Sequence, residues 1–242
     1  MGVLFLDLCR EVEYLGDELL AAAERVIRSG SYVLGQEVGL FEQEFASFAR
    51  TENCVTVGNG LHALELALRA WGIGEGDEVL VPANTFIATW LAVSASGAVP
   101  VPVDPDPGTL TIEARDVTAR ATANTAVVIP VHLFGVPSDV PAIRRSLEGR
   151  YVRILEDAAQ AHGASVKGVP VGGLGDAAAF SFYSSKTSAL SGIVGRSRRT
   201  TLVWRSLLAC CVVTVRRSST AMGSKEATPG LTSPRPPCLG SS

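Results

Sequence analysis

Apolar and polar positions follow a helical spacing in the first fifty residues of this chain. Residues 8–28 place Leu15, Leu19, Ala22 and Val26 on one face, which predicts an amphipathic helix. Glycines at positions 30 and 35 end this pattern, and residues 38–48 return to a helical spacing. The sequence therefore predicts two helices separated by a short break.

From residue 54 onward, short apolar runs alternate with amphipathic stretches. The runs predict strands, and the stretches between them predict helices. This alternation is typical of an α/β fold in which helices cover a mostly parallel sheet, and ligands of such sheets bind beyond the carboxyl ends of the strands. The expected strands are 54–57, 78–82, 99–103, 126–131 and 151–155, followed by an apolar run at 180–183, and the expected helices are 61–71, 84–96, 113–120 and 140–147.

Composition favours a soluble globular protein. The 242 residues are 47% hydrophobic, with a formal net charge of -3. No apolar run reaches the ~18 residues that a membrane helix needs, and residues 1–7 meet an acid at once, unlike a signal peptide. The five cysteines have neither metal-binding nor disulfide spacing. We therefore expect a cytoplasmic protein that has no metal site and is not bound to a membrane.

The charge is unevenly distributed. Residues 187–242 hold eight Arg or Lys and one acid, whereas residues 1–186 hold 13 basic and 23 acidic residues. Such a shift marks a boundary between a body at 1–186 and a basic tail, rich in Ser, Arg and Pro, at 187–242. A disordered tail is one interpretation. Nucleic-acid binding is disfavoured, because only Trp204 lies among the arginines.

Two stretches carry the candidate chemistry. The apolar run from Tyr151 ends in the carboxylate of Asp157, and a second run ends in Ser181, with Lys186 five residues later. A lysine amine can form a Schiff base with the aldehyde of pyridoxal phosphate. A carboxylate can pair with the ring nitrogen of this cofactor, and a hydroxyl can donate to its phosphate.

A glycine turn at 58–60 links a predicted strand to a helix. The free backbone N–H groups at such a helix start suit a phosphate. An ordinary strand-to-helix turn is the alternative interpretation.

Several motifs together resemble one family, the sugar aminotransferases of the DegT/StrS type, which are pyridoxal phosphate enzymes of fold type I. The resemblance implies an incomplete large domain with a three-layer, mostly parallel sheet. The matching stretches are Leu-Phe-Leu-Asp-Leu at 4–8, Gly-Glu-Gly-Asp-Glu-Val at 74–79, Pro-Ala-Asn-Thr-Phe-Ile-Ala-Thr at 82–89, Pro-Val-His-Leu-Phe-Gly at 130–135, Glu-Asp-Ala-Ala-Gln-Ala-His-Gly at 156–163 and Ser-Phe-Tyr at 181–183.

The resemblance assigns a role to each matching position. By motif, Lys186 is similar to the Schiff-base lysine and Asp157 to the partner of the pyridine nitrogen. Departures from the family pattern are Leu61 in place of Thr or Ser, Ser184 in place of Pro and Thr187 in place of Asn. The remaining cofactor-binding positions are Gln160 facing the ring hydroxyl, Phe86 stacking on the ring, Ser181 at the phosphate, and Gly60, Leu61 and His62 at a turn that offers backbone N–H groups to the phosphate.

The resemblance implies an aminotransferase that uses pyridoxal 5'-phosphate. Its substrate would be a nucleotide-linked keto-sugar, its amino donor a compound such as glutamate, and its intact form a homodimer. The pathway would make amino sugars, antibiotics or cell-surface polysaccharides. One alternative is a sugar dehydratase, although such relatives resemble this family with His in place of Lys186. Another is a non-catalytic fragment or a regulatory relative. For His132 and His162 two interpretations remain: each is either a core or capping residue, or a residue of the site.

The resemblance stops after Lys186. If one base is restored at the junction of Lys186 and Thr187, permitted codons spell Asn-Leu-Gly-Ala-Leu-Gly-Asp, which is family text. The segment 209–215 can then spell Val-Leu-Arg-Ser-Tyr-Gly, a second family phrase. We hypothesise a one-base deletion that leaves the tail out of frame. We expect such a tail to lie outside the fold, to leave a sheet edge bare, and to leave this chain as written without a competent active site.

Overall fold

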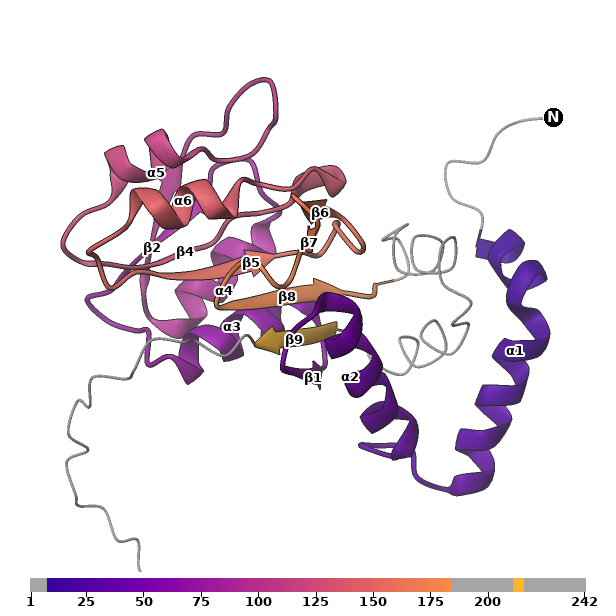
Figure 1. The fold of residues 1–242 in the computed structure, drawn as a ribbon. Coiled ribbons are helices and arrows are strands. Elements are labelled where there is room, and N and C mark those ends of the chain that lie inside the picture. The colour runs from indigo at the N-terminus through magenta and orange to yellow at the C-terminus, as the bar shows by residue number, and fades with distance from the viewer. Residues whose placement is uncertain (1–7, 184–210, 216–242) are drawn as a thin grey trace, which may run out of the picture.

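The protein is built around a single large sheet. The computed structural model describes residues 8–183 and 211–215. Among them, seven strands form one sheet in the order β1-β9-β8-β5-β4-β2-β3, and a two-stranded hairpin stands beside it (Figure 1). The strands of the large sheet are β1 Asn53–Val57, β2 Glu78–Pro82, β3 Val99–Val103, β4 Thr125–Val128, β5 Arg153–Asp157, β8 Ala177–Ser181 and β9 Cys211–Val215, and the hairpin consists of β6 Ser165–Val166 and β7 Val169–Pro170.

The large sheet is parallel except at one strand. The pairs β2 with β3, β2 with β4, β4 with β5 and β5 with β8 are parallel. Strand β9 runs antiparallel to both β1 and β8, so β1 has the same direction as the other strands. This arrangement confirms the predicted α/β class with a mostly parallel sheet.

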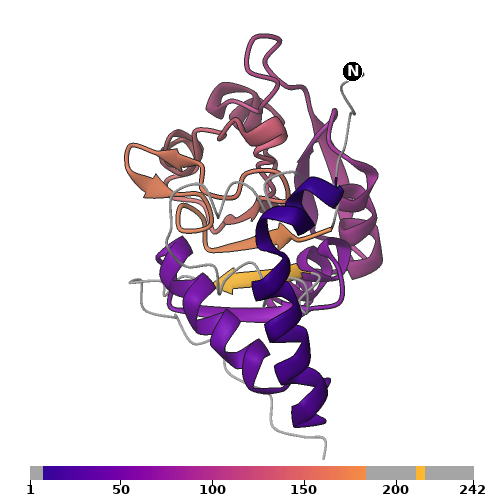
Figure 2. The same ribbon diagram turned by 90° about the vertical axis from the view of Figure 1, so that its right-hand side faces the viewer.

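Helices cover the two faces of this sheet, and two of them extend beyond it. Figure 1 shows α3 and α4 on one face, with α5 and α6 on the other. Helix α1 stands apart from the layers in Figure 1 and crosses in front of the body in Figure 2, whereas α2 leads from it to the sheet and buries Phe41 and Phe45 in the core. Their bounds are α1 Leu8–Ser29, α2 Gln36–Ala49, α3 Gly60–Ala70, α4 Ile87–Ser96, α5 Ala114–Arg120 and α6 Val140–Ser146, with a 3-10 turn at Leu133–Gly135.

Alternation along the strands divides the core into two clusters. Successive strand side chains point to opposite faces. Accordingly, Ile154 of β5 packs in the cluster that includes Phe41 of α2 and Ile143 of α6. Leu155, the next residue, packs with Leu64 of α3 and other residues on the opposite face. The same alternation separates the neighbouring acids Glu156 and Asp157 at the end of β5.

Several predicted boundaries shift in the structure. The helix expected at 84–96 begins at Ile87, because Phe86 has extended backbone angles and acts as its N-cap. The strand expected at 126–131 ends at Val128, two residues before Pro130, which has no N–H to continue the ladder. The strand expected at 151–155 runs instead from Arg153 to Asp157 and leaves Tyr151 exposed. The β6–β7 hairpin was not predicted.

The expectation of a bare sheet edge is wrong. Strand β9, which belongs to the tail, pairs along all five of its residues with both β1 and β8. Its Val213 and Thr214 side chains are buried. The physical reason is that Cys-Val-Val-Thr-Val is rich in β-branched residues that suit a strand. It also covers the backbone groups that β1 and β8 would otherwise expose. Thus the tail is not wholly outside the fold, although the rest of it lies outside the described residues.

Candidate active site

The predicted site residues follow the carboxyl ends of parallel strands. Asp157 and Ser181 are the last residues of β5 and β8, which are neighbours in the sheet. Ala177 and Ala179 of β8 pack in the cluster on the α3–α4 face, and so does Leu155 of β5. Because side chains alternate along a strand, Asp157 and Ser181 share that face. Helix α3 follows β1, and Phe86 follows β2, so their starts lie at the same edge.

Asp157 is a buried carboxylate with its orientation fixed on both oxygens. Asp157 is only 7% exposed. The Thr89 hydroxyl of α4 donates to Oδ2 at 2.8 Å, and the N–H of Ala159 donates to Oδ1 at 3.2 Å. The backbone is held as well, because the N–H of Asp157 donates to Pro130 and its carbonyl accepts from His132. An acid held in this way is suited to receive an N–H from a ligand ring.

The start of α3 is the candidate phosphate site. Gly60 and Leu61 are its first two residues, where helical N–H groups have no intrahelical acceptor and the helix dipole favours an anion. The N–H of His62 is already engaged, because it donates to Oδ1 of the N-cap residue Asn59 at 2.8 Å. The His62 ring contacts the same amide, with Nδ1 at 3.1 Å from Nδ2. Of the three positions, His62 would therefore offer its N–H only if the Asn59 cap moved.

The two predicted ring contacts, Phe86 and Gln160, differ in how far they are exposed. Phe86, at the N-cap of α4, is 68% exposed. Gln160 is half-buried, and its Oε1 accepts the N–H of Phe134 at 2.7 Å. This bond ties Gln160 to the turn that follows β4, so its amide is oriented by the segment next to Asp157 in the sheet.

The hydroxyl of Ser181 and the predicted lysine complete the list. Ser181 is buried, and its oxygen accepts the N–H of Tyr183 at 3.5 Å, which is a long hydrogen bond. Lys186 lies outside the described residues. The structure therefore brings the acid, the helix start and the serine to one edge of the sheet, while the position of the lysine stays a prediction.

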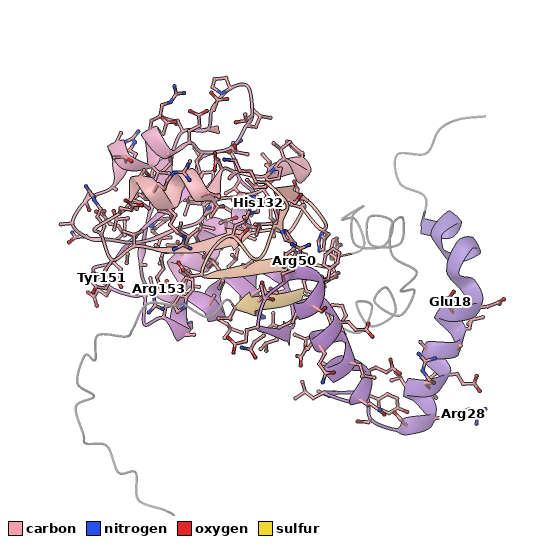
Figure 3. All side chains as sticks on the ribbon, viewed as in Figure 1. Glu18, Arg28, Arg50, His132, Tyr151 and Arg153 are labelled. Carbon is pink, nitrogen blue, oxygen red and sulfur yellow. The ribbon has the colours of Figure 1, made fainter. Side chains whose placement is uncertain are left out.

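The structure places both open histidines in the core. His132 is fully buried, and its Nδ1 accepts the N–H of Ser138 at 3.0 Å. Since Nδ1 accepts, Nε2 carries the proton and donates to Oε2 of Glu156 at 3.0 Å. His162 packs against the rings of Phe180 and Phe182, with centroids 5.3 and 4.9 Å away. Figure 3 shows His132 inside the body of the fold, far from the Glu18 and Arg28 side chains of α1.

Sequence reasoning missed two polar residues at this edge. Thr89 lies in a matched motif, and its only signal is a hydroxyl three residues after Phe86, in the first turn of a mostly apolar helix. The sequence singles out Glu156 only as part of the motif around Asp157. It is fully buried and accepts the N–H groups of three loop residues as well as the His132 proton. The loop donors are Gly172, Leu174 and Gly175.

The chain belongs to the DegT/DnrJ/EryC1/StrS aminotransferase family. The sequence model of this family matches residues 13–194. This match ends eight residues beyond Lys186. It confirms the family that the motifs indicated.

Curated relatives and solved structures agree with this membership. The dTDP-3-amino-3,4,6-trideoxy-alpha-D-glucose transaminase of Streptomyces venezuelae is 49% identical over 184 residues, which are 76% of this chain and 48% of the relative. A relative from Saccharopolyspora erythraea, named "Erythromycin biosynthesis sensory transduction protein EryC1", is 48% identical over 77% of this chain and 51% of its own length. The S. venezuelae DesV crystal structure, a complex with a ketimine intermediate, has a TM-score of 0.73 at 49% identity and covers 75% of this chain and 49% of that one. The chain thus spans about half the length of the curated relatives it matches.

The family implies pyridoxal phosphate as cofactor. The donor set described above fits this group, because it combines a buried carboxylate for a protonated ring nitrogen with a helix start for a phosphate. Among the residues that the structure describes, no group of three His, Cys, Asp or Glu side chains could hold a metal ion. None of the described helices has the length and apolar character needed to cross a membrane.

Proposed function

We propose that this chain is the cofactor-binding part of a pyridoxal phosphate-dependent aminotransferase. The enzyme transfers an amino group from a donor such as glutamate to a nucleotide-linked keto-sugar. The observation that carries the proposal is the oriented, buried carboxylate of Asp157 at the ligand-binding edge of the sheet. Relatives named as sugar-nucleotide transaminases support the substrate class.

The residues of this chain divide the work of binding. Asp157 receives the ring N–H, and the N–H groups of Gly60 and Leu61, together with the Ser181 hydroxyl, hold the phosphate. Phe86 packs on the ring, and Gln160 faces the ring hydroxyl. When bound, the cofactor supplies an electron-withdrawing ring that carries the amino group between donor and acceptor.

Lys186 is the proposed attachment point of the cofactor and the group that moves the proton during transfer. We also propose a homodimer in the cytoplasm, as implied by the family resemblance. The out-of-frame origin of the tail is part of this proposal, and resequencing the codons at Lys186 and Thr187 tests it. A reading frame with no missing base would refute a deletion.

Reductive trapping tests the site directly, because the sequence has only three lysines, Lys167, Lys186 and Lys225. The full chain is incubated with excess pyridoxal phosphate, reduced with borohydride and mapped by peptide mass spectrometry. The expectation that this chain lacks a competent site rested on a bare sheet edge, which β9 covers, so we expect the cofactor to bind. Modification should concentrate on Lys186 and persist in Lys167→Arg. Asp157→Asn should reduce it, because a neutral amide cannot stabilise a positively charged ring. Equal modification of all three lysines, or modification mainly of Lys167, would contradict the proposed site.

A non-catalytic or regulatory role is the second candidate. It is favoured by the name of the S. erythraea relative, which calls that protein a sensory transduction protein. A half-reaction distinguishes the two: the loaded chain either converts glutamate to 2-oxoglutarate or leaves it unchanged. Cofactor binding without conversion would favour the second role. The dehydratase alternative is disfavoured by Lys186, which stands where those relatives have His.

A further inference from the structure

A pair of hydroxyl groups, that of the buried Thr89 and that of the half-buried Thr85, stands behind the Asp157 carboxylate. Thr89 lies in the first turn of α4 and is 1% exposed. Its hydroxyl is 2.8 Å from Oδ2 of Asp157 and 3.0 Å from the hydroxyl of Thr85. The three groups form a line that runs from the segment after β2 to the end of β5.

The direction of the hydrogen bonds in this line follows from its last member. An ionised carboxylate only accepts, so the Thr89 hydroxyl must donate to Asp157. The Thr89 oxygen then accepts, and the Thr85 hydroxyl is its donor. Since a threonine hydroxyl has a single proton, the Asp157 contact determines how Thr89 and Thr85 are oriented.

Packing alone does not explain a threonine at this position. The buried neighbours of Thr89 in α4, Ala92 and Val93, belong to the apolar cluster on this face of the sheet. Valine has the same shape as threonine, and it would avoid burying a hydroxyl, which is unfavourable unless the hydroxyl is hydrogen-bonded. The hydroxyl here is bonded to the one acid that the proposed function places against the cofactor ring.

We infer that Thr89, supported by Thr85, is a positioning residue that fixes the Asp157 carboxylate for the ring nitrogen of pyridoxal phosphate. The inference rests on the proposed function. A carboxylate has room for about four hydrogen bonds, so the Thr89 contact orients it without excluding a ring N–H. Without the hydroxyl, the carboxylate can rotate away from the ring, and affinity for a ring that carries the nitrogen falls.

The test compares two ligands that need no covalent attachment to Lys186. These are pyridoxamine 5'-phosphate and its 1-deaza analogue, in which carbon replaces the ring nitrogen. Binding of each to the full chain is measured by calorimetry for wild type, Thr89→Val, Thr89→Ser and Thr85→Val. We expect Thr89→Val to bind pyridoxamine phosphate about tenfold more weakly, equivalent to about 1.4 kcal/mol, and to bind the deaza analogue as the wild type does. Thr89→Ser should bind both ligands as the wild type does, and Thr85→Val should lose less affinity than Thr89→Val.

The outcomes separate this inference from the function on which it rests. If the wild type binds pyridoxamine phosphate and Thr89→Val binds it equally well, the inference is overturned while the proposed function stands. An equal loss for both ligands also overturns it, because a purely structural defect does not depend on the ring nitrogen. If the wild type binds neither ligand, the proposed function fails for this chain, and the inference with it. Should circular dichroism show that Thr89→Val is unfolded, Thr89→Ala gives the same comparison of the two ligands and decides in the same way.

Discussion

Replacing Glu156 by Gln should destabilise the fold strongly, although the change removes no volume. Glu156 is fully buried, and each of its two carboxylate oxygens accepts two hydrogen bonds. Oε1 accepts from Leu174 at 2.9 Å and from Gly175 at 2.7 Å. Oε2 accepts from Gly172 and His132, each at 3.0 Å.

A glutamine can satisfy only half of this set. If its carbonyl faces Leu174 and Gly175, its NH2 group faces the donors of Gly172 and His132. His132 cannot simply change tautomer, because its Nδ1 must stay an acceptor for Ser138. Two buried donors therefore lose their partner, at about 1–3 kcal/mol each. The expected loss is about 2–6 kcal/mol, against the 5–15 kcal/mol that is typical of a whole domain.

Urea unfolding followed by circular dichroism measures this loss. With a urea dependence of about 2 kcal/mol per molar, the midpoint should fall by about 1–3 M, or the variant should be unfolded in buffer. Glu148→Gln is the matched control, because this glutamate is exposed, and its midpoint should stay close to that of the wild type. A Glu156→Gln midpoint within the error of Glu148→Gln would refute the reasoning, because the four contacts would then contribute nothing that an amide cannot replace.

Three further predictions concern other parts of the fold. Gly175→Ala should lower the free energy of unfolding by about 1–3 kcal/mol, because a Cβ would lie 2.8 Å from the Ile154 carbonyl oxygen, whereas Gly39→Ala, with open space around it, should not. Burial, with a smaller contribution from Glu42, raises the pKa of the Cys54 thiol, so iodoacetamide should label Cys54 only after unfolding, as peptide mapping would show; rapid native labelling would contradict this. Backbone hydrogen bonds, chiefly from the N–H of Thr109 and then from that of Gly108, hold the pKa of the Asp106 carboxyl below its ordinary value of 3.8. The stabilisation from these bonds is therefore present at neutral pH and is lost as the pH falls below 3.8. An NMR titration of Asp106 with a midpoint at or above 3.8 would count against them.

Element type was largely predictable from the sequence, because it follows local periodicity. The amphipathic spacing from Leu15 to Val26 predicted α1, and the apolar run at 78–82 predicted β2 with its observed bounds. Boundaries were less predictable where a single residue decides them. Phe86 takes extended angles before α4, and Pro130 stands just beyond β4. Such ends depend on backbone hydrogen bonds that periodicity does not encode.

The candidate site was predictable only as far as motifs name residues. Asp157 and Ser181 were placed correctly at strand ends, since a parallel sheet brings such ends to one edge. The Thr89 contact could not be predicted, because it joins residues 68 apart in sequence. The capping of His62 by Asn59 is local, and Asn is a preferred N-cap residue. Reading Asn59 as a cap would have shown that the N–H of His62 already has an acceptor.

The neighbouring acids at the end of β5 have separate tasks, and the loop before β8 connects one of them to the tail. Asp157 points to the face where the cofactor is proposed to bind, and Glu156 points to the other. Glu156 accepts the N–H of Gly172, while the carbonyl of Gly172 accepts the Thr214 hydroxyl of β9 at 3.3 Å. The loop therefore receives support from the buried acid on one side and from the tail strand on the other. Because this loop leads directly into β8, both contacts support the register that sets Ala179 opposite Asp157 and Ser181 two residues beyond it. A strand at the β9 position is thus part of what holds the site together, whichever reading frame supplies it.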